Sequence, residues 1–361
     1  MGKFFGRKRR SRPRSVSTNL PFVRFIGPVV SIAGFMAVLG LVVTGRVDFA
    51  SFDLRQSNTE QELSGVAIGP VSLAPLMEKS AESITIATFN VQGFGTAKSA
   101  DKGVLSVIAS VLSRFDVVAI QELEDGNASA VQLLVEQLES AGGQYAYTVS
   151  EPVGRKSKTC SYAYVWDKNR VQFVPGSAYV VQDSADRMRF EPMVASFEAR
   201  VGTADGRRPF RFTLINVHTS SADVAPSAVA NEMNVLDDVF VRVRQYDYES
   251  TGEEDCILLG DLNVDTAGLQ ELGQIPNIES IAGDTKTDTV RISTLDHLLI
   301  DRTMTREYTG RYGVVDLQRE FGLSQEQALS ISDHMPLWAE FSVHEVPRFD
   351  AVATGSGAVR Y

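Results

Sequence analysis

The sequence is poor in the residues that crosslink small domains or bind soft metal ions. Its 361 residues include two cysteines, Cys160 and Cys256, and four histidines. Two cysteines cannot build a disulfide framework or a cysteine-rich zinc centre, and so few histidines argue against a histidine-rich metal site. A chain of this length with 43% hydrophobic residues can bury a large core without such crosslinks. The composition therefore excludes a wholly disordered chain and favours one large domain or two.

Acidic residues are missing from the first 47 positions, where the charge is entirely positive. Residues 1–24 carry eight bases: Lys3, Arg7, Lys8, Arg9, Arg10, Arg12, Arg14 and Arg24. The remainder carries 27 Lys and Arg against 45 Asp and Glu. A body this acidic repels polyanions at long range, which argues against a protein that binds DNA stoichiometrically and tightly. A nucleic-acid substrate stays open, because divalent cations and a local basic rim can overcome the repulsion.

Charge is also missing from Phe25–Thr44, a run of apolar residues that follows the basic segment. Twenty helical residues span about 30 Å, the thickness of the hydrocarbon core of a bilayer. A buried core helix would carry a polar face, whereas this run has only Ser31 and Thr44. A signal peptide cleaved near Val43-Thr44-Gly45 is the other reading, although signal peptides have apolar runs of roughly 7–15 residues. We predict an uncleaved single-pass anchor, and secretion if it is cleaved.

The basic segment sets the expected topology, because positive flanks stay in the cytoplasm. The predicted organisation is a cytoplasmic segment (1–24), a transmembrane anchor (25–45), a tether without sustained periodicity (46–82), a catalytic domain (83–345) and a flexible tail (346–361). The membrane is then a partner through Phe25–Thr44, and no obligate protein partner is evident.

The body alternates expected strands and helices. Strands are predicted at 83–91, 116–123, 145–150, 161–167, 170–175, 193–201, 210–218, 256–263, 293–300 and 335–343, and helices at 104–115, 128–140 and 228–244. This pattern predicts an α/β (α+β) fold in which two packed mixed β-sheets lie between outer helical layers.

Polar residues recur where the apolar strands end. The pairs and triplets are Phe89-Asn90, Gln121-Glu122, Asn216-Val217-His218, Asp261-Leu262-Asn263, Leu295-Asp296 and Ser332-Asp333-His334. Each alone reads as an ordinary turn, but together they indicate one site. Carboxylates with few histidines favour Mg²⁺ (or Mn²⁺) over Zn²⁺. Such a cation neutralises a phosphodiester, and two histidines can share acid and base duties, so the residues predict metal-assisted phosphoester hydrolysis.

These motifs resemble the endonuclease/exonuclease/phosphatase superfamily, and within it the deoxyribonuclease I branch. They read TFNVQGFG, IQELED, SEPVGR, LINVHTSS, LLGDLNVD, TLDHLLI and GLSQEQALSISDHMPLW, within Ile84 to Val343. The resemblance implies a sandwich of two mixed sheets and endonucleolytic cleavage of DNA with Mg²⁺, supported by Ca²⁺. It implies roles at the metal for Asn90, Glu122 and Asp333. The expected catalytic residues are His218, His334, Asp296, Asp261 and Asn263, with Asp296 supporting His334.

The resemblance further implies substrate contacts by Arg155 and Tyr162. The segment with Asp284, Thr287 and Thr289 fits either a calcium site or a polar threonine-rich loop. Several positions depart from the branch. Lys158 and Cys160 replace a Tyr and a Glu, and that Glu orients the first catalytic histidine, His218 here. Gln92 and Glu124 replace DNA-contacting arginines, and Thr266 and Ser293 replace a disulfide.

Three functions follow from the sequence. The leading one is a membrane-anchored, metal-dependent deoxyribonuclease I-like endonuclease. The second is another phosphoesterase of the superfamily, acting on a lipid head group or a small phosphodiester, which suits an anchored enzyme. The third is a non-catalytic binding module on a degenerate scaffold. Cys160 supports the third function, whereas the retained Glu122, Asp261 and His334 argue against it.

Overall fold

The computed structural model describes residues 67–69, 79–124, 128–155, 158–201, 206–228 and 231–347. They belong to a compact unit, Ser64–Tyr361. Within these residues no helix combines the length and apolar character needed to cross a membrane. The predicted anchor Phe25–Thr44, the basic segment before it and residues 348–361 of the predicted tail lie outside the described residues.

The first sheet, called sheet 1, has the strand order β13-β14-β1-β2-β5-β3, with β4 paired to β5. β1 and β2 are parallel, and the other pairs of this sheet are antiparallel. Its strands are β1 (Ser83–Phe94), β2 (Val117–Leu123), β3 (Tyr145–Val149), β4 (Val153–Arg155), β5 (Lys158–Asp167), β13 (Tyr308–Val314) and β14 (Leu337–Ser342).

The second sheet, called sheet 2, has the order β11-β12-β10-β9-β8-β6, with β7 paired to β8. Here β9 and β10 are the parallel pair. Its strands are β6 (Val171–Phe173), β7 (Tyr179–Val180), β8 (Met193–Ala199), β9 (Arg211–His218), β10 (Cys256–Asp261), β11 (Ile278–Ser280) and β12 (Asp296–Asp301). Both sheets are mixed, as the sequence predicts.

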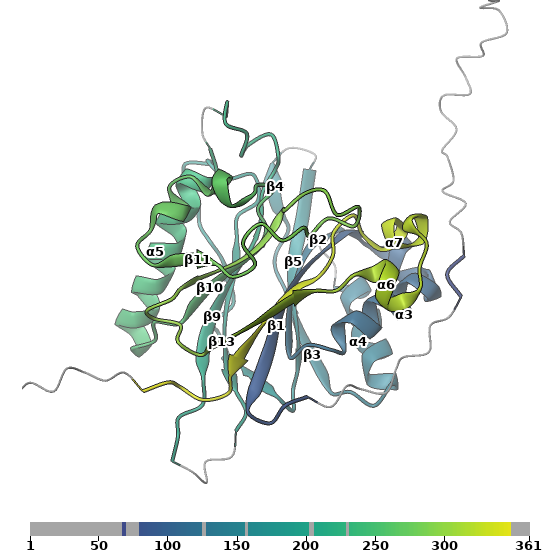
Figure 1. The fold of residues 1–361 in the computed structure, drawn as a ribbon, viewed down its shortest axis with the longest axis horizontal. Coiled ribbons are helices and arrows are strands. Elements are labelled where there is room, and N and C mark those ends of the chain that lie inside the picture. The colour runs from purple at the N-terminus through teal and green to yellow at the C-terminus, as the bar shows by residue number, and fades with distance from the viewer. Residues whose placement is uncertain are drawn as a thin grey trace, which may run out of the picture. The chain divides into compact units, whose positions relative to one another are not determined.

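Helices cover the outer faces of the two sheets (Figure 1). They are α2 (Thr96–Ala100), α3 (Lys102–Leu112), α4 (Ser129–Ser140), α5 (Met233–Thr251), α6 (Leu317–Phe321) and α7 (Gln325–Ile331), with the 3₁₀ turns η5 (Thr266–Leu269) and η6 (Leu272–Gln274). One apolar cluster joins α3, α4 and α7 to sheet 1, another joins α5 to sheet 2, and a third fills the space between the sheets. The predicted sandwich between helical layers is confirmed.

Several elements differ from the sequence predictions. The last predicted helix ends near Arg244, whereas α5 continues to Thr251 and stops at Gly252, whose φ of 77° is a left-handed cap that glycine adopts without strain. β13 was not predicted, because its residues are mostly exposed and lack alternation. In the predicted tether, Ile68 packs into the sheet 1 core and Lys79 lies 3.1 Å from an Asp116 carboxylate oxygen.

The parallel pair in each sheet positions the functional residues. Asn90 is in register with Gln121, and Asp261 with His218, at the carboxyl ends of these strands. Gly260 allows β10 to pass close to β9, since a Cβ there would lie 1.9 Å from the Val217 carbonyl oxygen. The strand ends of both sheets therefore meet along one edge of the sandwich.

Candidate active site

A hydrogen-bonded seam joins the two sheets at this edge. The Asn90 amide Nδ2 donates to Glu122 Oε1 at 2.9 Å and to Asp261 Oδ2 at 3.0 Å. Asn90 and Glu122 belong to sheet 1, whereas Asp261 ends β10 of sheet 2. Deeper in the seam, Gln121 Nε2 donates to Asn216 Oδ1 at 2.6 Å. All these side chains except Glu122 are buried, so the amides replace the water that the acceptors would otherwise need.

Both predicted catalytic histidines converge on one carboxylate oxygen. Asp261 Oδ2 lies 3.7 Å from His218 Nε2 and 3.5 Å from His334 Nε2. Asp261 Oδ1 accepts the Asn263 backbone N–H at 3.0 Å, and Asn263 Nδ2 donates to the Thr219 carbonyl at 2.9 Å. The structure thus brings together four of the five residues predicted for catalysis, and the fifth, Asp296, contacts His334.

Asp296 holds His334 from the other side of the ring. His334 Nδ1 lies 2.9 Å from Asp296 Oδ2, and both residues are buried. Burial by itself lowers the pKa of His334, but the charges of Asp296 and Asp261 outweigh it and raise that pKa well above its ordinary value. The two carboxylates therefore favour the protonated form of His334, with an acceptor facing each ring nitrogen.

His218 has a different environment. Its ring stacks on Phe190, with centroids 4.9 Å apart and planes 5° from parallel. Its Nε2 lies 3.4 Å from Glu122 Oε1, but Nδ1 is buried and has no hydrogen-bond partner among the described residues. Cys160 lines the same cavity, and burial raises the pKa of its thiol to about 12, so it stays neutral. The sequence predicts that His218 lacks an orienting carboxylate, because Cys160 stands in its place. The unpaired Nδ1 agrees with this prediction.

The donor atoms fit a hard divalent cation. One group, Glu122–His218–Asp261, places its ligand atoms within 4.8 Å of one another. A second group, Asp261–Asp296–His334, is equally close, but there Asp296 and His334 pair with each other, which leaves Asp261 as its available ligand. Asp333 adds a buried Oδ1 that lacks a hydrogen-bond partner within the described ranges and lies 3.8 Å from His334 Nε2. Oxygen-rich sets of this kind suit Mg²⁺, Mn²⁺ or Ca²⁺ better than soft metals.

Three of the seven non-glycine residues with positive φ among the described residues lie at or beside this site. Glu122 and Asn263 have φ values of 57° and 53°, and Gln92, two residues after Asn90, has 43°. Side chains other than glycine seldom adopt this region, at a cost of about 1–3 kcal/mol each. The strain turns the chain at the strand ends, so that these side chains face the cavity.

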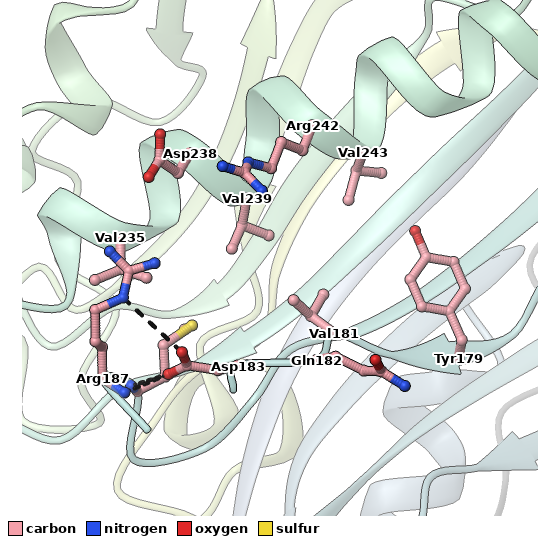
Figure 2. A pocket seen from close by; sticks show the side chains of 11 residues that line it. Tyr179, Val181, Gln182, Asp183, Arg187, Val235, Asp238, Val239, Arg242 and Val243 are labelled. Carbon is pink, nitrogen blue, oxygen red and sulfur yellow. Dashed lines mark hydrogen bonds and ion pairs between the residues drawn. The ribbon is translucent and has the colours of Figure 1, made fainter. Parts of the chain in front are cut away.

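The cavity at the strand ends has a volume of about 450 Å³. It is lined by Gly93, Glu122, Leu123, Glu124, Lys158, Thr159, Cys160, Arg189, Phe190, His218, Thr219, Ser220, Ser221, Asp261, Asn263, Asp333 and His334. A smaller hollow of about 210 Å³ lies against α5 (Figure 2), where Asp183 is paired with Arg187. That hollow has no histidine, and neither does a third cavity of about 460 Å³ lined by Asp116, Glu320 and Glu340, so the cavity with His218 and His334 is the candidate active site.

The predicted substrate residues lie apart from this cavity. Arg155 is not among its lining residues; its Nε is 2.8 Å from Asp186 Oδ1, and its Nη2 donates to the Met188 carbonyl at 2.6 Å. Tyr162 is fully buried, and its hydroxyl accepts the His218 backbone N–H at 3.1 Å. Tyr162 is therefore too buried to contact a substrate directly, and its hydroxyl instead holds the backbone of His218.

The predicted calcium residues have separate partners. Asp284 Oδ1 accepts the Thr266 hydroxyl at 2.5 Å, whereas the Thr287 hydroxyl accepts the Asp296 backbone N–H at 3.0 Å. The Thr289 hydroxyl donates to the Ser332 carbonyl at 2.7 Å. Thr287 and Thr289 thus hold the backbone on either side of the Asp296–His334 pair, and calcium binding here stays a prediction.

Sequence reasoning missed Lys98, which lies beneath the catalytic edge. Its ammonium group donates to the carbonyls of Val91, Gln92 and Ile331 at 2.9, 2.5 and 2.8 Å. Burial lowers the pKa of Lys98 to about 8, although Asp333, Glu122 and Glu124 oppose this shift. Lys98 connects the strained turn after Asn90 to the end of α7, just before Asp333 and His334. The sequence offers no local signal for this role.

Arg189 was also missed, although it lines the cavity. Its Nε lies 2.6 Å from Asp223 Oδ2. Beneath it, the fully buried Glu232 accepts the backbone N–H groups of Arg189 and Ser220. Glu232 and Asp223 therefore fix a cationic group on the cavity rim.

Comparison with known proteins agrees with this geometry. A model of the endonuclease/exonuclease/phosphatase family matches residues 87–334, which include both predicted catalytic histidines. The chain belongs to this family. Human Deoxyribonuclease-1-like 1 is 31% identical over 75% of this chain and 88% of that protein. Human Deoxyribonuclease-1 is 30% identical over 74% of this chain and 95% of that protein. These relatives place the chain in the deoxyribonuclease I-like branch of the family.

The family fold is also found among solved structures. An endonuclease/exonuclease/phosphatase family protein from Bacteroides thetaiotaomicron superimposes with a TM-score of 0.50 at 17% identity. The match covers 73% of this chain and 98% of that one. The similarity supports the two-sheet sandwich.

We expect Lys98→Met to lower the free energy of unfolding by about 1–3 kcal/mol, because three carbonyls, two of them partly buried, lose a charged donor. Urea denaturation of the full-length protein would measure this loss. Lys98→Arg should recover part of it, and Lys102→Met, which changes an exposed lysine, should leave it unchanged. An equal loss of unfolding free energy in Lys98→Met and Lys102→Met would contradict a stabilising role of the Lys98 hydrogen bonds.

Proposed function

We propose that this protein is a divalent-cation-dependent phosphodiesterase, an endonuclease that cuts DNA. The observation that supports this most is the convergence of His218 and His334 on Asp261, with Glu122 and Asn90 beside them. A proton donor, a proton acceptor and a group of carboxylates that could bind a cation then lie at one cavity. The named deoxyribonuclease relatives support DNA as the substrate.

The protonated His334 is suited to act as the general acid. Glu122, Asn90 and Asp333 would hold Mg²⁺ or Mn²⁺, which neutralises the phosphate charge when bound. Water attacks phosphorus, the bond to the leaving oxygen breaks, and His334 Nε2 donates its proton to that oxygen. Asp296 on Nδ1 keeps the ring oriented throughout.

His218 is suited to accept the proton of the attacking water, because its Nε2 faces the carboxylates of Glu122 and Asp261. Asp261 and Asn263 position that water. The imidazolium formed on His218 would have no acceptor at Nδ1 within the described structure. His218 is therefore the weaker member of the pair, and its chemistry should limit the rate.

The cavity rim offers mixed signs to a polyanion. Arg189 and Lys158 supply positive charge, whereas Glu124 adds negative charge. This balance favours weak, cation-dependent contact with duplex DNA over tight binding. A second candidate, hydrolysis of a lipid head group or small phosphodiester, is favoured by the same Glu124 and by Cys160 facing the cavity.

The location is part of the proposal. The uncharged run Phe25–Thr44 after eight basic residues supports a single-pass anchor with the catalytic domain on the extracytoplasmic side. Cleavage of that run would release a secreted enzyme.

The activity itself is tested by incubating the full-length protein with plasmid DNA, RNA, sphingomyelin and a chromogenic phosphodiester. We expect nicking of DNA with Mg²⁺ or Mn²⁺ and none in EDTA. His334→Ala or Asp261→Ala should lower turnover by about 10²–10⁴-fold, the range for loss of one acid–base group. Full activity in EDTA would disprove the cation-dependent mechanism, and faster cleavage of sphingomyelin than of DNA would favour the second candidate.

The pH dependence of turnover tests the role of His334. A general acid must be protonated, so activity should fall as pH rises through the pKa of His334. Asp296→Asn removes a charge that raises this pKa. The fall should then begin at lower pH, and an unchanged basic limb would remove His334 from the acid role.

The positions that depart from the branch can be tested separately. Cys160→Glu should give His218 Nδ1 an acceptor and raise turnover on duplex DNA, whereas Cys160→Gln is the uncharged control. Glu124→Arg should instead tighten DNA binding and steepen its salt dependence by one phosphate contact. If Cys160→Glu slows cleavage of DNA, the site is adapted to its thiol.

Membrane topology can be measured in intact cells. Protease added outside the membrane should digest the catalytic domain and spare a tag on the N-terminus. The protein should resist carbonate extraction. A mature N-terminus near Arg46 would show that the apolar run is cleaved.

A further inference from the structure

Acidic residues gather at the end of the sandwich opposite the catalytic edge. Asp255 precedes β10, Glu307 precedes β13, and Glu345 follows β14. Glu253 lies two residues before Asp255. Asp255 and Asp261 lie at opposite ends of β10, and a strand rises about 3.3 Å per residue, so the two carboxylates are about 20 Å apart. We call Glu253, Asp255, Glu307 and Glu345 the distal acidic cluster.

Backbone amides orient three of these carboxylates. Glu253 Oε1 accepts the Asp255 N–H at 2.9 Å. Glu345 Oε1 accepts the Arg211 N–H at 3.0 Å, and Glu307 Oε1 accepts the Val346 N–H at 2.6 Å. In each of these three carboxylates one oxygen accepts a backbone N–H. The other oxygen remains available to bind a ligand.

Two of the remaining oxygens are buried without a donor. Asp255 Oδ1 and Glu307 Oε2 are inaccessible and have no N–H or O–H donor in good hydrogen-bond geometry in the described part of the chain, although the Asp255 carboxyl lies beside the Thr305 hydroxyl and the Glu307 carboxyl. Both residues are 3% exposed. The ligand oxygens of Glu253, Asp255 and Glu345 lie within 4.8 Å of one another. Buried acceptors are nearly always satisfied in folded proteins, so these two oxygens point to a missing ligand.

The charges at this end are not balanced by ion pairs. None of the four carboxylates forms a salt bridge among the described residues, although Arg211 favours ionised Glu253 and Arg208 favours ionised Glu345. Burial, followed by Glu307 and Glu253, raises the pKa of Asp255 to about 10. Burial also raises the pKa of Glu345 to about 7. Without a counter-ion, the four groups cannot all be ionised at neutral pH.

We propose that the distal acidic cluster is a binding site for a divalent cation, and that Ca²⁺ is the ion its chemistry fits. Every candidate ligand is an oxygen, as hard cations require. The ligands come from separate segments at irregular positions, which suits the flexible coordination of Ca²⁺ better than the strict octahedron of Mg²⁺. The site is independent of the proposed catalytic function.

The cation would connect the two sheets at this end. The segment after β14, in sheet 1, pairs with the chain entering β9 of sheet 2: the Phe210 N–H donates to the Val343 carbonyl at 2.8 Å, and Pro209 bridges His344. Asp255 leads into β10 of sheet 2, and its carbonyl accepts the Thr213 N–H at 2.8 Å. A shared cation would hold these segments together and raise the stability of the domain.

The test uses full-length protein stripped with EGTA and titrated with Ca²⁺ by calorimetry. We expect the parent to bind one more Ca²⁺ per chain than Asp255→Asn/Glu307→Gln, or to bind it at least about tenfold more tightly, because the variant loses two charged ligands. Ca²⁺ should also raise the Tm of the parent by at least about 3 °C, and the Tm of the variant by less.

Two control variants separate this site from other effects. Glu249→Gln changes an exposed carboxyl of α5, and Glu122→Gln changes the catalytic site; both should keep the distal binding event. Equal Ca²⁺ binding by the parent and the double variant would overturn the proposal. A second result would also overturn it: the double variant is more stable than the parent in EGTA, and Ca²⁺ does not change the Tm of the parent. The carboxyls would then be stabilised by sharing protons and not by a cation. If the double variant does not fold, Glu345→Gln takes its place with the same two outcomes.

Discussion

The active site depends on one amide that lies between two carboxylates. Asn90 donates one hydrogen bond to Glu122 of sheet 1 and another to Asp261 of sheet 2. Two carboxylates this close repel each other, and burial of Asp261 increases the cost. The amide satisfies one oxygen of each but neutralises neither. The charge that remains, beyond what His334 and His218 offset, is the physical reason for proposing a cation at this edge, and the same seam sets the distance between the residues that each sheet contributes.

The two histidines differ because their surroundings differ in charge. His334 lies between Asp296 and Asp261, whose charges raise its pKa and favour its protonated form. His218 has carboxylates on its Nε2 side only, with an aromatic ring against its face. Such an asymmetric pair already separates an acid from a base. The neutral Cys160 therefore weakens one of the two roles without removing the other.

Much of the site could be predicted from the sequence, because apolar strands followed by short polar segments are visible as a pattern. Asn90, Glu122, His218, Asp261 and His334 all follow that pattern, and parallel strand pairs bring such ends together. Lys98 could not be found in this way, since its partners Val91 and Ile331 are brought to it only by the folded chain. β13 was missed for a related reason: an exposed edge strand carries no alternation of apolar residues.

The residues predicted for calcium show that closeness in sequence does not determine which partner a side chain has, while calcium binding there stays a prediction. Asp284 and Thr287 lie close in sequence, yet one side chain bonds to Thr266 and the other to the backbone of Asp296. Thr266 stands where the branch has a half-cystine, and its hydrogen bond to Asp284 anchors the same loop without a disulfide. The opposite holds for the distal acidic cluster, whose members are spread over almost a hundred residues and meet only in the fold. A domain with far more acids than bases thus gathers buried carboxyl groups at both ends of β10. At the catalytic end His334 and His218 offset part of the charge of Asp261, whereas the distal cluster has no such partner, and a cation at each end is what we propose.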